Sequence, residues 1–222
     1  MSRAELPDSA VSADLERFRN IRWLHNHWSR STSPRAYFWY LTFEHCPGLH
    51  SLTRQCQEAI NFRYYDLTPP RDLHLTLDRI AFDDDISTGV LADITAAAIH
   101  ACQLMPAFDI TIGPLGGTPG AIGFSASPGE QLKSLRDKLR AATLSVYPQA
   151  PVRRSEFHPH VAIAYANSDN VPAAQVIAAV ENLNATVCTD VTVRVTDGTL
   201  VLLEQRPRSY AWEAVTRIPL AS

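Results

Sequence analysis

One stretch of the chain, residues 73–80 (LHLTLDRI), alternates between apolar and polar residues over its first six positions. Leucines occupy every second position, and His74, Thr76 and Asp78 stand between them. Side chains point alternately to the two faces of a β-strand, so this pattern predicts a strand with one buried face. The other face is expected to carry a histidine, a hydroxyl and a carboxylate.

A second stretch, residues 157–165 (FHPHVAIAY), shows the same alternation. His158, His160 and Ala162 share one face, and the residues between them, ending in Tyr165, form the apolar face. The sequence therefore predicts two strands that each present histidine to whatever borders their polar face.

Apolar periodicity and turn residues predict the remaining elements. Residues 13–28 carry apolar side chains at helical spacing and are expected to form an N-terminal helix that packs on the main body. Further strands are expected at 36–44, 108–115, 121–127, 186–195, 199–205 and 209–218, and further helices at 47–61, 92–102, 129–146 and 172–183.

The middle of the chain repeats a β-α-β unit. The first copy is strand 36–44, helix 47–61 and strand 72–82, and the second is strand 121–127, helix 129–146 and strand 158–166. Two such copies build two lobes related by a pseudo-twofold axis. That axis would bring His74 and His160 to one cleft, although they are 86 positions apart (160 − 74).

Composition narrows the classes of protein to consider. A chain of 222 residues that is 45% hydrophobic can bury a core of ordinary size. Its formal net charge of −3 argues against a partner held by many backbone phosphates, such as a long nucleic acid. Four scattered cysteines, no signal-like start and no long apolar run favour a cytoplasmic protein with reduced thiols and no membrane partner.

Two imidazoles facing one cleft suit general acid/base catalysis. Their unperturbed pKa near 6.5 allows one ring to be neutral while the other is charged at neutral pH. Cleavage of a phosphodiester needs such a pair, because one proton leaves the attacking oxygen while another reaches the departing oxygen. Thr76, two residues along the face from His74, could donate a hydrogen bond to a phosphoryl oxygen.

The segments HLTL (74–77) and HVAI (160–163) resemble the paired His-x-Thr/Ser motifs of the 2H phosphoesterase superfamily. That superfamily includes 2′-5′ RNA ligase-like proteins and cyclic phosphodiesterases. The segments YFWYLTFE, FDITIGPLGG and YAWEAVTRIPL also resemble the 2′-5′ RNA ligase-like branch, and the resemblance runs from about Arg35 to Leu220.

The resemblance implies an α+β fold with duplicated β-α-β units and two antiparallel sheets around a central V-shaped cleft. Because the resemblance begins near Arg35, it implies a single bilobal domain over residues 35–222, and the apolar spacing of 13–28 predicts a helical N-terminal extension over 1–34. The resemblance also implies metal-independent catalysis by His74 and His160 without a cofactor, and phosphate binding by Thr76. The second motif departs from the pattern, since Ala162 stands where Thr or Ser is expected.

The expected activity is hydrolysis of a 2′,3′-cyclic phosphate or a short 2′-5′-linked nucleotide. The substrate is thus a small nucleotide or phosphodiester, with short RNA as a further candidate partner. Which histidine is acid and which is base stays open. His158, Tyr40 and Arg153 are candidates for an auxiliary role that could compensate for Ala162.

Three alternatives remain. The histidine pair could act on a non-nucleotide metabolite in a biosynthetic pathway, or the cleft could bind a nucleotide without turning it over. His74 with His158 and His160 could also hold zinc, which usually takes three protein ligands. The hydroxyl of Thr76 and the lack of a carboxylate beside His160 make a metal site the weaker hypothesis.

Overall fold

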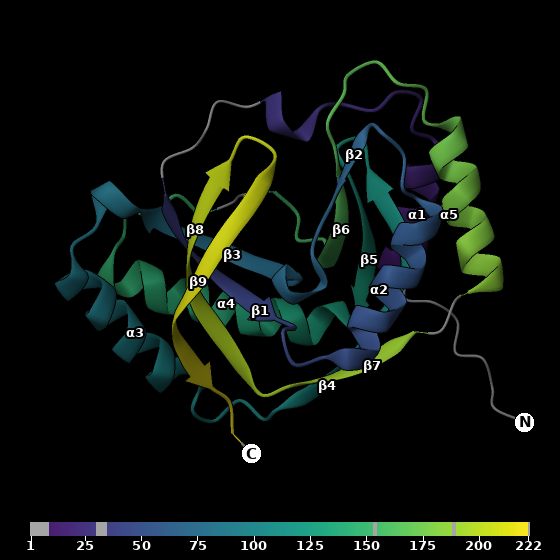
Figure 1. The fold of residues 1–222 in the computed structure, drawn as a ribbon. Coiled ribbons are helices and arrows are strands. Elements are labelled where there is room, and N and C mark those ends of the chain that lie inside the picture. The colour runs from purple at the N-terminus through teal and green to yellow at the C-terminus, as the bar shows by residue number, and fades with distance from the viewer. Residues whose placement is uncertain (1–8, 30–34, 153–154, 188–189, 222) are drawn as a thin grey trace, which may run out of the picture.

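The structure is a computed structural model that describes residues 9–29, 35–152, 155–187 and 190–221. Two antiparallel sheets form its framework (Figure 1). The first sheet has the order β3 (His74–Phe82), β1 (Ala36–Thr42), β8 (Asp197–Arg206) and β9 (Ser209–Pro219). The second has the order β2 (Tyr65–Leu67), β6 (His160–Ala166), β5 (Ala121–Ser127), β4 (Phe108–Thr118) and β7 (Val191–Val195). The predicted α+β class with two antiparallel sheets is confirmed.

Five α-helices and three short 3₁₀ turns accompany the sheets in the described ranges. The α-helices are α1 (Ser9–Arg19), α2 (Pro47–Ala59), α3 (Thr88–Cys102), α4 (Gly129–Val146) and α5 (Ala174–Thr186). The 3₁₀ turns are η1 (His27–Ser29), η2 (Pro70–Asp72) and η3 (Asp83–Asp85). None of these helices is long and apolar enough to cross a bilayer.

The N-terminal helix is shorter than its apolar spacing predicts. It ends at Arg19 and not at residue 28, because the chain beyond it becomes extended. The backbone N–H of Leu24 donates to the carbonyl of Val171, and Trp23 forms an isolated bridge with Pro172. This pairing with the segment before α5 replaces the intrahelical hydrogen bonds. The division of the chain between residues 34 and 35 stays a prediction.

The two copies of the predicted repeat are present as β1-α2-β3 and β5-α4-β6. In each copy the two strands are antiparallel neighbours within one sheet. The helices, however, cross between the lobes. Leu52 and Cys56 of α2 lie against Phe124 of the second sheet, and α4 covers the first sheet, with Thr143 accepting a hydrogen bond from Trp39 at 2.9 Å.

This exchange of helices joins the two lobes through one hydrophobic core. Buried side chains of both sheets belong to a single continuous cluster, which includes Trp39 and Leu75 from the first sheet and Phe124 and Ile163 from the second. Burial of apolar area is the main favourable term in folding. Each helix of the repeat contributes side chains to this shared core, so the core helps to fix the relative position of β3 and β6.

Candidate functional site

A cleft of about 620 Å³ is lined by residues of both sheets. His74 and Thr76 of β3 line one wall, and His160 of β6 lines the other. The two histidines are close enough for the charge of His160 to lower the pKa of His74. The structure therefore brings together the three residues on which the sequence argument rests.

Both histidines are held in the same way. The Nδ1–H of His74 donates to the carbonyl of Asp72 at 2.9 Å, and the Nδ1–H of His160 donates to the carbonyl of His158 at 2.8 Å. In each case the acceptor lies two residues before the histidine. A carbonyl can only accept, so these bonds fix the proton on Nδ1 and leave Nε2 of each neutral ring as a base.

The surroundings of the two rings differ. Burial lowers the pKa of His74 to about 4, since the charged imidazolium is penalised away from water; the nearby His160 acts in the same direction, and the bond to Asp72 opposes both. His160 is exposed to solvent. His74 is accordingly neutral across the physiological range.

Tyr40, predicted as an auxiliary residue, contacts His74 directly. Its ring is stacked on the imidazole, with centroids 4.3 Å apart. The indole of Trp212 meets the same imidazole edge-on at 6.4 Å, and its Nε1–H donates to the carbonyl of Asp72 at 3.3 Å. The His74 ring is thus enclosed by two aromatic side chains and one backbone acceptor.

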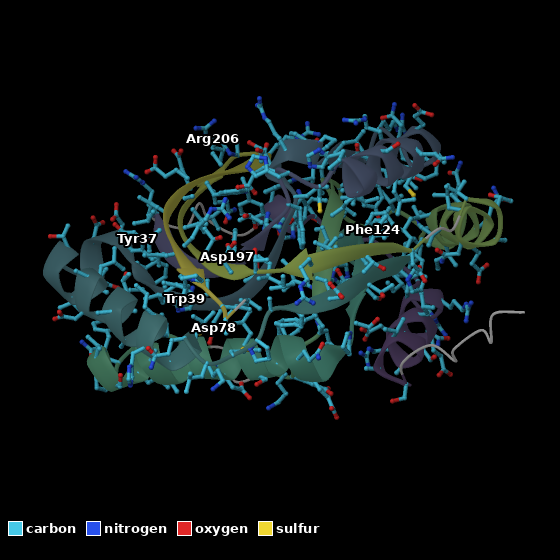
Figure 2. All side chains as sticks on the ribbon, turned by 90° about the horizontal axis from the view of Figure 1, so that it is seen from below. Tyr37, Trp39, Asp78, Phe124, Asp197 and Arg206 are labelled. Atoms are coloured by element: carbon cyan, nitrogen blue, oxygen red, sulfur yellow. The ribbon has the colours of Figure 1, made fainter. Side chains whose placement is uncertain are left out.

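A β-bulge in β3 overturns one prediction. Trp39 pairs with Asp78 and Tyr40 with Thr76, so Leu77 is an extra residue in β3. An extra residue reverses the alternation of faces beyond it. Asp78, expected beside His74, is instead buried at 2% exposure on the opposite face, with Arg140 of α4 at 2.5 Å. Figure 2 shows Asp78 on the side of the sheet that faces α4.

The same bulge turns the next residue, Arg79, into the cleft. A matching bulge occurs in β6, where Ile122 pairs with Ala164 and Gly123 with Ala162, so Ile163 is the extra residue. It brings Tyr165 into the cleft, although the alternation predicts the apolar face. Arg79 and Tyr165 therefore hold equivalent positions, each five residues after a histidine.

Ala162 has a neighbour that the sequence argument missed. Ser125 of β5 pairs directly with His160, and its side chain lines the cleft. Directly paired residues of antiparallel strands have Cβ atoms about 4.5–5.5 Å apart on the same face. Ser125 thus offers a hydroxyl beside His160, the counterpart of Thr76 beside His74. In the sequence, the alternation of Ser125 with the buried Phe124 is the only sign that Ser125 faces the cleft. Nothing in the sequence around Ser125 indicates that it pairs with His160.

The remaining auxiliary candidates differ in position. His158 lies at the edge of the cleft, where its Nδ1 is 3.3 Å from Asp14 and 3.2 Å from the guanidinium of Arg17, both on α1. Its backbone carbonyl, and not its ring, contacts His160. Arg153 lies outside the described residues.

An aromatic group from distant parts of the chain lines another part of the cleft wall. The Nε2 of His27 is 2.7 Å from the hydroxyl of Tyr210, and the His27 ring lies 4.3 Å from that of Tyr165. Trp28 donates to Asp66 at 2.9 Å, and the same carboxylate binds Arg208 near the tip of the β8–β9 hairpin. These contacts tie that hairpin to the second sheet.

No group of three or more His, Cys, Asp or Glu side chains with the arrangement of a metal site occurs among the described residues. The zinc hypothesis requires His158 to converge with the other two histidines. Its ring is instead directed to Asp14 and Glu156.

Known proteins share this fold and these sequence features. A family model described as the 2′-5′ RNA ligase superfamily matches residues 49–200. The structure of TT0787 from Thermus thermophilus is similar, with a TM-score of 0.65 and 20% identity over 83% of this chain and 97% of that one. E. coli LigT in complex with NADP⁺ gives a TM-score of 0.63 at 17% identity over 86% of this chain and 100% of LigT. No curated protein matches the sequence significantly.

Proposed function

Because the chain belongs to the 2′-5′ RNA ligase superfamily, we propose that it hydrolyses a 2′,3′-cyclic phosphate or a short 2′-5′-linked nucleotide, with His74 and His160 as the acid/base pair. The observation that carries the proposal is the shared anchoring of the two rings. Each Nδ1–H is held by a backbone carbonyl, so each Nε2 is the nitrogen available for proton transfer in one cleft.

The lowered pKa of His74 supports the role of base for His74, and hence of acid for His160, in hydrolysis. Neutral His74 takes a proton from water through Nε2 as the water oxygen attacks phosphorus. Protonated His160 gives its Nε2 proton to the ribose oxygen as the phosphorus–oxygen bond breaks. Afterwards His74 carries the proton and His160 is neutral, and exchange with solvent restores the starting state.

Two hydroxyls support the phosphate. Thr76 is two residues after His74 on the same wall, and Ser125 is paired with His160 on the other wall. Both are suited to donate hydrogen bonds to the non-bridging oxygens as charge develops on them. In this proposal Ser125 takes the role that Ala162 cannot fill.

The nucleotide class of substrate has support from a relative of the same fold. LigT of E. coli has been solved in complex with 3′-AMP, with ATP and with NADP⁺. A cleft of about 620 Å³ is within the usual volume of small-molecule sites. The cleft of this chain is accordingly proposed to take a nucleotide or short oligonucleotide.

Hydrolysis of adenosine 2′,3′-cyclic phosphate by the purified protein tests the proposal. His74→Ala and His160→Ala should each lower kcat by about 100-fold or more, as expected for loss of a general acid or base. His100→Ala is the matched control, because His100 is an exposed residue of α3 outside the cleft. Full turnover of cyclic and 2′-5′ substrates by the His74→Ala, His160→Ala double variant would contradict it. Tight nucleotide binding without turnover by the wild type would favour a binding protein instead.

A further inference from the structure

Resting on the proposed function, we propose that Arg79 and Arg136 form a second anion site in the cleft, which binds a phosphate group of the substrate other than the one between the histidines. Both side chains line the cleft. The substrate class that follows is a nucleotide that carries an additional, terminal phosphate.

Arg79 is half-buried and has unsatisfied hydrogen-bonding capacity. Its Nε is buried without a hydrogen-bond partner, and the residue forms no ion pair within the described ranges of the chain. Its guanidinium carbon lies 4.9 Å from the ring centre of Phe82. An aromatic face contributes attraction to a cation but no hydrogen-bond acceptor. Since an unmatched buried donor costs free energy, a bound anion would offset a cost that the protein alone leaves in place.

Arg136 contributes a second guanidinium from α4. It is 5% exposed, and its guanidinium carbon lies 4.7 Å from the ring centre of Phe157. Arg140, one helical turn later, contacts Asp78, the residue before Arg79. Residues four apart share one face of a helix, so Arg136 lies on the face of α4 that carries Arg140, and its side chain lines the cleft. The two cations therefore line the same cleft.

Arg79 is separate from His74 along the first sheet. His74 pairs with Thr42, and Arg79 pairs with Phe38, four residues away along β1. At about 3.4 Å per residue, the two backbone positions are about 14 Å apart along the sheet. Arg79 therefore extends into the cleft from a different position along the sheet than His74. A nucleotide with phosphates at two positions can reach both, and the forked donors of arginine suit the terminal phosphate.

A comparison of two substrates tests the site. Adenosine 2′,3′-cyclic phosphate and its 5′-phosphorylated form differ only in the additional phosphate. The wild type should prefer the 5′-phosphorylated form in kcat/KM, with the preference residing in KM. Arg79→Gln should reduce that preference about 10- to 100-fold, the scale of a charge-assisted hydrogen bond. Arg194→Gln, on β7 and half-exposed beside Asp109, should leave the preference unchanged.

Binding of inorganic pyrophosphate, measured by calorimetry, separates this inference from the proposed function. If neither nucleotide is turned over, the proposed function fails, but the anion site still predicts pyrophosphate binding that survives His74→Ala and weakens at least tenfold in Arg79→Gln. Arg79→Lys keeps a cation and should retain part of the affinity, which guards against a folding defect in the glutamine variant. Equal affinity in wild type and Arg79→Gln, or no binding by the wild type, overturns the second site. A substrate preference that Arg79→Gln leaves intact overturns it as well.

Discussion

The ring of Tyr40 lies parallel to the imidazole of His74, with the two planes inclined by 6°. Tyr40 is 2% exposed, so the core holds it in place. Together with the bond from Nδ1 to the carbonyl of Asp72, this stacking fixes both the plane and the rotation of the His74 ring. A catalytic group that is held in its reactive orientation before the substrate arrives needs no reordering during the reaction.

Replacing Tyr40 should therefore affect turnover more than binding. We expect Tyr40→Leu to lower kcat about 3- to 10-fold with KM nearly unchanged, because an aromatic pair contributes about 0.5–1.5 kcal/mol beyond its buried area. Tyr40→Phe keeps the stacked ring and should retain most of the activity. Steady-state kinetics on a 2′,3′-cyclic nucleotide measures both variants. Equal losses in the two variants would assign the effect to the hydroxyl and not to the stacking.

Ser125 is expected to act as the second phosphate-binding hydroxyl. Ser125→Ala should lower kcat about 100-fold, the scale seen when one donor to a developing oxyanion is lost. Ala162→Thr, introduced into that variant, should recover part of the loss because it returns a hydroxyl to the face of His160. Ser145→Ala on α4 is the matched control, since its hydroxyl is bonded to the carbonyl of Ala142.

The combination of these variants decides between two accounts of Ala162. Full activity in Ser125→Ala, together with a gain from Ala162→Thr alone, would mean that the protein operates without a second hydroxyl. A loss of activity in Ser125→Ala that Ala162→Thr partly restores would mean that in this protein the second phosphate-binding hydroxyl is supplied by Ser125 of β5 and not by position 162 of β6.

The pH dependence of activity should reflect the lowered pKa of His74. The base must be neutral to work, and burial lowers its pKa to about 4. We expect the acidic limb of the kcat/KM profile to fall near pH 4, well below the unperturbed value near 6.5. Rates measured from pH 3.5 to 8 test this. An acidic limb near pH 6.5 would contradict the role of His74 as the base.

The same shift predicts how stability changes with pH. Between about pH 6.5 and pH 4 the unfolded chain binds a proton at His74 that the folded protein does not, so folding loses stability as pH falls through that window. Above the pKa of His74 in the unfolded chain, the folded and unfolded states bind the same number of protons at His74, and this loss of stability is absent. His74→Asn removes the titrating group and should flatten the decline. Urea unfolding at pH 7 and pH 4.5, for the wild type and this variant, provides the comparison.

The sequence was sufficient for the motif and for most elements, because both depend on local periodicity, but not for β2, the end of α1 or the start of β7. Alternation identified the strands of His74 and His160, and the repeat correctly indicated that they share a cleft. The bulges at Leu77 and Ile163 were not foreseeable, since one unpaired residue is a property of the register between two strands. Each of these bulges reversed the face of the residues that follow it, until the next register shift in β3 at Ile80.

Residues that reach the cleft from elsewhere in the chain carried no local signal. His27 lies on a 3₁₀ turn outside any periodic segment, and it reaches Tyr210 only because the β8–β9 hairpin folds toward the second sheet. Ser125 reads as an ordinary residue of a strand until its register with His160 is known. Long-range pairing therefore determined the parts of the site that the sequence argument missed.

The buried ion pair between Asp78 and Arg140 is expected to hold α4 against the sheet that carries His74. The Asp78 side chain is 2% exposed, and that of Arg140 is 21% exposed. Removing one partner of a buried pair leaves a cation in a poorly hydrated site, so Asp78→Asn should destabilise the fold by about 3 kcal/mol. Asp137→Asn is the control on the same helix, because its pair with Lys133 is exposed and should contribute less than about 0.5 kcal/mol.

Chemical denaturation measures the free energy of unfolding of both variants. Turnover measures whether the loss of stability also lowers catalytic activity. Arg136 is one turn before Arg140 on α4 and lines the cleft, so a displaced helix would move it. Asp78→Asn should therefore weaken pyrophosphate binding as well as folding, while Asp137→Asn changes neither. Lost stability with unchanged pyrophosphate affinity would mean that the position of Arg136 does not depend on the ion pair.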